Sequence, residues 1–174
     1  KVIGLGTKPV DERIILETTQ IQYFLSEQSE NVMRVIALWT MKVHLDDSGN
    51  VVGITGVNEE HYEEADGVLL EIVLMERLDN ILEKDKYGNI ELLRDELKTE
   101  EGVIRFAENI GRALFAVHNN SFLHRDIKLE NIFWDKELEQ YKLGDFGIAR
   151  YVGEDGAETV VFTDGYGAPE IERQ

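Results

Sequence analysis

The sequence predicts an α+β fold from three observations. Residues 11–29 carry apolar side chains roughly on one face of a helix. Residues 32–45 read as a strand, because apolar and polar side chains alternate toward its end. Residues 99–119 return to helical spacing. The apolar positions are Ile14, Ile15, Ile21, Phe24 and Leu25 in the first helix and Val103, Ile104, Ala107, Ile110, Leu114 and Val117 in the second.

Two more strands are expected between these helices. Residues 47–50, Asp-Ser-Gly-Asn, are a strong turn signal, so residues 51–57 are expected to return as a partner strand. Residues 68–75 are almost entirely apolar and predict a buried strand. Residues 79–86 are expected to form a short helix.

Three short motifs follow the second long helix in a fixed order. The first is His-Arg-Asp-Ile-Lys-Leu-Glu-Asn at residues 124–131. Asp145-Phe146-Gly147 begins 19 positions after Asp126, and Ala168-Pro169-Glu170 ends 25 positions after Asp145. Any one of them could occur by chance, but three in this order and at these intervals very rarely do.

The residue types in these motifs suit phosphoryl transfer. That reaction needs an acceptor for the proton of the attacking hydroxyl, oxygen ligands for a metal ion and cations near the phosphates. Asp126, Asn131 and Asp145 can supply the oxygens, and Lys128 can supply a cation close to Asp126. The alternative is a charged loop, because Asp and Asn are common in turns.

A predicted hairpin joins two of these residues. Residues 132–134 and 141–143 read as short strands, with a turn that starts at residue 135. Asn131 would then enter the hairpin and Asp145 would leave it, so both could face one cleft.

The ordered motifs resemble the eukaryotic-type serine/threonine protein kinase family. The resemblance implies a protein-kinase-like two-lobed fold with a small β-sheet lobe that holds one helix and a mainly helical lobe. It implies that Asp126 orients the substrate hydroxyl and accepts its proton, and that Lys128 lies near the transferred phosphate. Asn131 and Asp145 would bind Mg²⁺ or Mn²⁺, and ATP would be the phosphate donor.

The resemblance also implies an ATP-binding set. Lys1 and Glu17 would form the ion pair that positions the lysine on the phosphates; the alternative is that Lys1 is a frayed terminal residue and Glu17 an exposed helix acid. Glu12 is a weaker candidate for the acidic partner. Met75 would be the gatekeeper, unless it is an ordinary core residue. The backbone of Glu76 and Leu78 would bond the adenine edge.

The resemblance divides the chain at a hinge. Residues 1–75 would be a partial N-lobe, residues 76–79 the hinge and residues 80–174 a partial C-lobe through the activation segment. No Gly-x-Gly-x-x-Gly loop precedes Lys1, and the sequence stops soon after Glu170, so the kinase domain is expected to be incomplete at both ends. The interval before residue 68 is longer than is usual for the family and suggests an inserted hairpin.

Three residues are predicted to be regulatory. Thr163 opens the Thr-x-x-Tyr-x-Ala-Pro-Glu pattern and would contact Asp126 and Lys128. By resemblance, Arg125 pairs with a phosphorylated residue of the activation segment, for which Thr159 is the best-placed acceptor. The alternatives are that Thr159 is an ordinary exposed residue or that a nearby acid replaces the phosphate: Glu154, Asp155 or Glu158.

Composition limits the partners. The formal net charge of −17 argues against nucleic acid and is compatible with protein substrates that carry basic residues near the target hydroxyl, a preference that Glu130 would support. The sequence has no cysteine and no apolar stretch long enough to span a membrane, which favours a cytoplasmic or nuclear protein. Two alternatives remain: a pseudokinase or scaffold of the same fold, and a small-molecule kinase.

Overall fold

The computed structural model describes residues 2–3, 12–56, 68–84, 86–152 and 166. The chain divides into two compact units, each of which is described here by itself. The first unit is formed by Lys1–Glu17 and Val35–Met75. The second is formed by Thr18–Arg34 and Glu76–Gln174.

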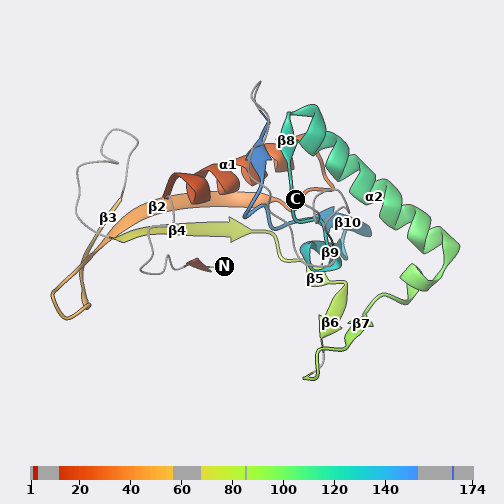
Figure 1. The fold of residues 1–174 in the computed structure, drawn as a ribbon, viewed down its shortest axis with the longest axis horizontal. Helices are drawn as coiled ribbons and strands as arrows, with labels where there is room; N and C mark the ends of the chain where they lie inside the picture. The colour runs from red at the N-terminus through yellow and green to blue at the C-terminus, as the bar shows by residue number, and fades with distance from the viewer. Residues whose placement is uncertain (1, 4–11, 57–67, 85, 153–165, 167–174) are drawn as a thin grey trace. The chain divides into compact units, whose positions relative to one another are not determined.

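The first unit contains an antiparallel sheet with the strand order β1-β4-β2-β3 (Figure 1). Its long central strands pair from Val35 opposite Met75 to Val43 opposite Val68. The strand predicted at residues 32–45 begins three residues later than expected, at Val35. Residues 32–34 belong to the second unit. The strands are β1 (Val2–Ile3), β2 (Val35–Leu45), β3 (Val51–Gly56) and β4 (Val68–Met75).

A tight turn joins β2 to β3, as the sequence predicts. One carboxylate oxygen of Asp46 accepts the backbone N–H groups of Ser48 and Asn50, both at 2.9 Å. Gly49 adopts φ +81°, a left-handed conformation that glycine reaches without strain. The bonds to Asn50 hold the pKa of the Asp46 carboxyl below its usual value, so the turn keeps an ionised acceptor at neutral pH.

Helix α1 (Glu12–Gln28) crosses the division between the units. In the second unit Ile21 and Leu25 are buried, as their helical spacing predicts. Phe24, on the same predicted apolar face, is 43% exposed. The side chains of Ile14 and Ile15 lie outside the described part of the chain.

Helix α2 (Glu100–Asn119) begins at the N-cap Thr99, whose hydroxyl accepts the Gly102 N–H at 3.1 Å. Its buried face includes Ile110 and Val117, as predicted. Val103 and Ile104 are about half exposed, at 50% and 51%, and Ala107 is exposed as well, so the predicted apolar face is wrong over the first two turns. The buried face is completed by Gly102, Asn109, Ala113 and Ala116.

The short helix predicted at residues 79–86 is wrong. Strand β5 (Asp79–Asn80) pairs with Trp134 and Phe133, and strand β6 (Leu82–Lys84) pairs with β7 (Ile90–Leu92). Leucine, glutamate and lysine are good helix formers, but intrinsic propensity is a weak constraint, and these strand pairings override it.

The hairpin predicted after Asn131 is confirmed. Strands β9 (Ile132–Asp135) and β10 (Gln140–Leu143) pair from Gln140 opposite Asp135 to Leu143 opposite Ile132. Strand β8 (Phe122–Leu123) pairs with β11 (Arg150–Tyr151), and two 3-10 helices, η2 (Asp95–Lys98) and η3 (Leu129–Asn131), precede α2 and β9.

A single described apolar core holds the second unit together. It joins α1, α2, the β9–β10 hairpin and the segment after β10, so both ends of the hairpin are anchored in packed side chains. Its buried members are Ile21, Leu25, Val32, Ile81, Ile110, Ala113, Val117, Ile132, Trp134, Tyr141, Leu143, Phe146 and Ala149.

Candidate active site

The segment from β8 through η3 brings two predicted catalytic side chains, those of Lys128 and Asn131, to the carboxylate of a third, Asp126. The Lys128 ammonium nitrogen Nζ lies 2.6 Å from Asp126 Oδ2. Asn131 Nδ2 donates to the same Oδ2 and to the Asp126 carbonyl oxygen, both at 2.8 Å. The Asp126 side chain is 13% exposed and that of Lys128 is 20% exposed, so the pair is largely shielded but open to solvent.

These contacts orient the Asn131 amide. Because its NH₂ group is engaged by Asp126, the carbonyl oxygen Oδ1 is the atom that can bind a cation. Asn131 is buried at the end of η3, and its backbone carbonyl accepts the Gly144 N–H at 2.9 Å. This bond connects Asn131 directly to the residue before Asp145.

Asp145 is held in an uncommon backbone conformation. Its φ is +58°, in the left-handed region that costs a residue with a side chain roughly 1–2 kcal/mol. Gly144, immediately before it, is fixed by the bond to Asn131 and by a contact between its carbonyl oxygen and His124 Nε2 at 3.0 Å. The Asp145 side chain is exposed. Such strain at a fixed position is typical of functional sites.

His124 is a packed histidine. It is 2% exposed and its ring lies edge-on to Phe146, with centroids 4.5 Å apart. The Asp126 N–H donates to Nδ1 at 3.2 Å, so Nδ1 is unprotonated and Nε2 donates to Gly144. Burial lowers the pKa of His124, which keeps the ring neutral at pH 7.

Lys128 is a firmly charged cation in this site. The hydrogen bond to Asp126 raises the pKa of the Lys128 ammonium, and the negative charges of Asp126, Glu130 and Asp145 raise it further. Partial burial acts in the opposite direction but is outweighed. Asp126 and Glu130 lie in the predicted catalytic loop and Asp145 lies just after the β9–β10 hairpin, so the lysine is in a local negative field.

Arg125 and Glu130 lie in the same 124–131 motif and have partners of their own. Arg125 Nε donates to the Ile148 carbonyl oxygen at 2.7 Å. Glu130 accepts from Lys84 Nζ at 2.9 Å and from the Tyr166 hydroxyl at 3.3 Å. Burial, and to a lesser degree Arg150, lowers the pKa of the Arg125 guanidinium.

Several predicted site residues are not brought together by the described structure. Lys1, Thr159 and Thr163 lie outside the described residues, as does the Glu17 side chain, although the Glu17 backbone belongs to α1. Met75 ends β4 in the first unit. Their predicted roles stay predictions.

The predicted hinge begins in the second unit. The Glu76 N–H donates to the Arg34 carbonyl oxygen at 3.1 Å, so any bond from Glu76 to an adenine edge would use its carbonyl oxygen. Leu78 is partly exposed.

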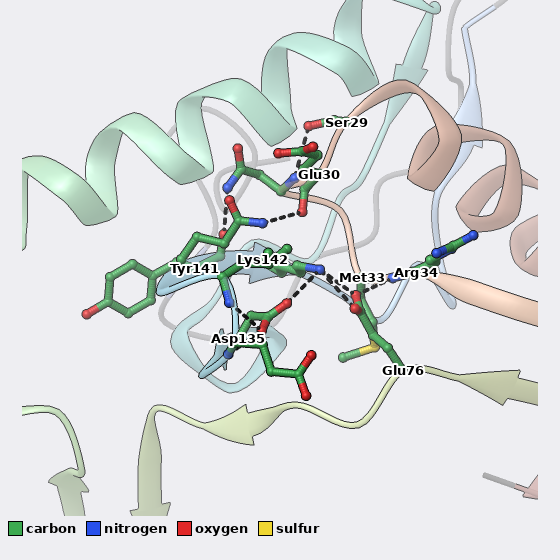
Figure 2. Close-up of polar contacts among 12 residues, drawn as sticks. Ser29, Glu30, Met33, Arg34, Glu76, Asp135, Tyr141 and Lys142 are labelled. Carbon is green, nitrogen blue, oxygen red and sulfur yellow. Dashed lines mark hydrogen bonds and ion pairs between the residues drawn. The ribbon is translucent and has the colours of Figure 1, made fainter.

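A largely buried ion cluster next to this segment was not predicted from the sequence. Figure 2 shows Lys142 between Glu76 and Asp135, with Lys142 Nζ 2.8 Å from Glu76 Oε2 and 2.9 Å from Asp135 Oδ2. The one signal for it is a lysine between Tyr141 and Leu143 in a strand that is buried on both faces. A buried lysine requires a carboxylate partner.

The donor set near Asp126 fits a magnesium ion that is shared with phosphates. Asn131 Oδ1 and the Asp145 carboxylate are oxygen ligands, and Mg²⁺ is usually held by one or two such groups plus phosphates and water. Within the described residues, no three His, Cys, Asp or Glu side chains group as metal ligands by themselves. In the same part of the chain, no helix has the length and apolar character needed to cross a membrane.

Comparison with known proteins places these features in one family. The family model for the protein kinase domain matches residues 18–174. The chain therefore belongs to the protein kinase domain family, as the ordered motifs predict.

Its relatives include kinases of several organisms. Serine/threonine-protein kinase Nek6 of Oryza sativa subsp. japonica is 40% identical over 87 residues, which are 50% of this chain and 16% of that protein. Nek8 of Danio rerio is 42% identical over 76 residues, or 43% and 11%. MAP kinase-activated protein kinase mak-1 of Caenorhabditis elegans is 28% identical over 155 residues, or 86% and 28%. The chain thus spans less than a third of each of these relatives.

Proposed function

We propose that this chain is the catalytic part of an ATP-dependent protein kinase that phosphorylates serine or threonine. The observation that carries the proposal is the Asp126 carboxylate, which is bonded to both Lys128 and Asn131. Asn131 is bonded in turn to the residue before Asp145. A proton acceptor, a cation and two oxygen ligands are what phosphoryl transfer requires of a protein.

Each residue has a distinct task in this proposal. Asp126 orients the substrate hydroxyl and accepts its proton, and its bonds to Lys128 and Asn131 fix the carboxylate before substrate arrives. Lys128 neutralises charge on the transferred group. Asn131 Oδ1 and Asp145 are the residues that would hold Mg²⁺ or Mn²⁺, which supplies charge neutralisation to the ATP phosphates when bound.

The nucleotide side of the site is proposed from the family resemblance. The hinge would be residues 76–79, between an N-lobe of residues 1–75 and a C-lobe of residues 80–174. The Glu76 carbonyl oxygen and the Leu78 backbone would bond the adenine edge, with Met75 as gatekeeper. Lys1 and Glu17 would pair to position the lysine on the phosphates.

Substrate class follows from the catalytic loop and the relatives. Lys128 occupies a position that is typically lysine in serine/threonine kinases, and the relatives described above are named as kinases of that class or as a MAP kinase-activated kinase. Thr163 would contact Asp126 and Lys128 and close the platform for a protein substrate. Glu130 would favour a basic residue near the target hydroxyl.

The test is phosphate transfer from labelled ATP to a mixed basic protein substrate. We expect Asp126→Asn to lower the rate by roughly 10²- to 10⁴-fold, which is the usual contribution of a positioned general base. Asp95→Asn is the matched control, because Asp95 is an exposed acid paired with Lys98. Equal rates for wild type and Asp126→Asn would contradict the proposal. Binding of Mg-ADP without any transfer would instead indicate a pseudokinase.

Regulation by phosphorylation is proposed for Thr159, with Arg125 as the partner of the phosphate. Phosphate can order a loop through charge-assisted bonds to arginine. We expect phosphatase treatment to lower the activity of wild type, and Thr159→Ala to start at the lowered level and not respond. Activity of wild type that phosphatase leaves unchanged would remove the idea and leave a nearby acid as the partner of Arg125.

A further inference from the structure

We propose that Lys142 is a positioning residue that ties the predicted hinge to the strand leading into Asp145. The inference rests on the proposed function, because it assigns Glu76 to the nucleotide side and Asp145 to the metal side. It concerns a cluster whose residues all belong to the second unit.

The cluster consists of one cation and two carboxylates that are largely buried from solvent. Side-chain exposure is 5% for Lys142, 9% for Asp135 and 19% for Glu76. Lys142 Nζ donates to both carboxylate oxygens of Glu76, at 3.0 and 2.8 Å. Three donor positions on one ammonium group are thus used by two acids that stand far apart in sequence.

Each carboxylate of the cluster also accepts hydrogen bonds from backbone N–H groups, so the cluster connects backbone segments as well as side chains. Glu76 Oε1 accepts the Arg34 N–H at 2.6 Å, while the Glu76 N–H donates to the Arg34 carbonyl oxygen. Asp135 Oδ1 accepts the N–H groups of Glu137 and Leu138 at 2.9 and 3.1 Å, which closes the β9–β10 turn. Burial opposes ionisation of Asp135, but Lys142 and these N–H groups together lower its pKa.

A backbone ladder carries the connection toward Asp145. Leu143, next to Lys142, donates to the Asn31 carbonyl oxygen at 2.7 Å and accepts from the Met33 N–H at 2.8 Å. Gly144 then donates to Asn131, and Asp145 follows. The strand that carries Lys142 is therefore connected to both predicted metal ligands: Gly144 is bonded to Asn131, and Asp145 is the third residue after Lys142.

The charge balance explains why Lys142 is needed for position. Without its ammonium group, two carboxylates would face each other in a poorly solvated space and repel. Glu76 would then move away from the hairpin. The expected consequence is a loss of coupling between the nucleotide-contacting segment and the metal-binding segment.

The alternative is that the cluster only stabilises the fold. A measurement of nucleotide binding can distinguish this purely stabilising role from the positioning role. The experiment measures the dissociation constant of ADP with and without Mg²⁺ for the whole chain. In wild type we expect Mg²⁺ to tighten ADP binding. In Lys142→Met we expect the ratio of the two constants to shrink about fivefold or more, a usual size for coupling between sites. Lys142→Arg should restore much of the ratio.

Tyr141→Phe is the matched control. Tyr141 lies in the same strand, and the variant removes a partly buried hydrogen bond, from the Tyr141 hydroxyl to Glu96 at 2.6 Å, without changing a residue of the cluster. We expect it to destabilise the fold but to keep the wild-type Mg²⁺ ratio. If Lys142→Met fails to fold, Glu76→Gln replaces it, because it removes the hinge carboxylate from the cluster while the amide oxygen can still accept the Arg34 N–H.

The outcomes are distinguishable. A Mg²⁺ ratio in the cluster variant equal to that of wild type overturns the positioning role and leaves the proposed function intact. A wild type that binds ADP equally with and without Mg²⁺ also overturns it. A wild type that binds no ADP at all contradicts the proposed function itself.

Discussion

Glu130 carries a charge that the chain itself already partly neutralises. The Lys84 ammonium contacts it in an exposed ion pair, with the Lys84 side chain 52% exposed. Hydrogen bonding to Lys84 is the largest influence that lowers the pKa of the Glu130 carboxyl, so the acid is ionised at neutral pH. Exposed pairs of this kind are worth about 0–1 kcal/mol, so a basic substrate residue could compete for the same carboxylate.

Removing Lys84 should therefore strengthen any preference for basic substrates. For Lys84→Gln we expect the ratio of kcat/KM for arginine-containing over alanine-containing peptides to rise by up to about fivefold, the equivalent of 1 kcal/mol. The measurement is a peptide pair that differs only at residues near the target hydroxyl.

The matched control for this prediction is Lys98→Gln, which removes an exposed lysine from its pair with Asp95. It should leave the peptide ratio unchanged. If Lys84→Gln and Lys98→Gln behave alike, Glu130 does not select basic residues.

Helix α2 contains two glycines in opposite surroundings. A Cβ at Gly102 would clash with the backbone carbonyl of Glu96, in the turn that precedes the helix. A Cβ at Gly111 would meet nothing within 4 Å. The same substitution should therefore have effects of opposite sign near the start of this helix and in its middle.

We expect Gly102→Ala to lower the free energy of unfolding by roughly 1–3 kcal/mol, because backbone atoms must move to admit the methyl group. Gly111→Ala should raise it by roughly 0.5–1 kcal/mol, since alanine favours the helix more than glycine does. Urea unfolding of the two variants beside wild type checks both signs. Destabilisation by Gly111→Ala would show that this face of α2 is more crowded than the structure indicates.

Elements with strong local signals could be predicted from the sequence. The α2 helix and the β9–β10 hairpin follow from spacing and turn residues, and the hairpin connects Asn131 to Asp145 as expected. Residues 79–86 could not be predicted, because their strands depend on partners at residues 90–92 and 133–134. Local preference decides little where such pairings form.

The candidate site divides in the same way. The bonds among Asp126, Lys128 and Asn131 span at most five positions, so the motif alone brings them together. The contact of Lys142 with Glu76 spans 66 positions and that of Lys84 with Glu130 spans 46. No spacing rule in the sequence relates residues so far apart, and only the fold brings these charges together.

At the scale of the whole molecule, we expect the free energy of unfolding to fall in two stages as the pH is lowered. Because the pKa of His124 is lowered in the fold, the unfolded chain binds more protons once pH falls below the ordinary value of 6.5. Stability is full above that pH and declines below it. The pKa values of Glu96 and Asp135 are also lowered, so their contribution is present above the ordinary values of 4.5 and 3.8 and is lost as pH falls through that range.

We expect the free energy of unfolding to fall between pH 7 and pH 5 at up to about 1.4 kcal/mol per pH unit for one proton. In His124→Gln this first stage should be weaker, because glutamine can still donate to the Gly144 carbonyl but does not titrate. The loss below about pH 4.5 should persist in the variant. Urea unfolding of both proteins across this range gives the comparison. Parallel curves for the two proteins from pH 7 to pH 5 would mean that His124 is protonated at no cost to the fold, against the bond that the Asp126 N–H makes to its Nδ1.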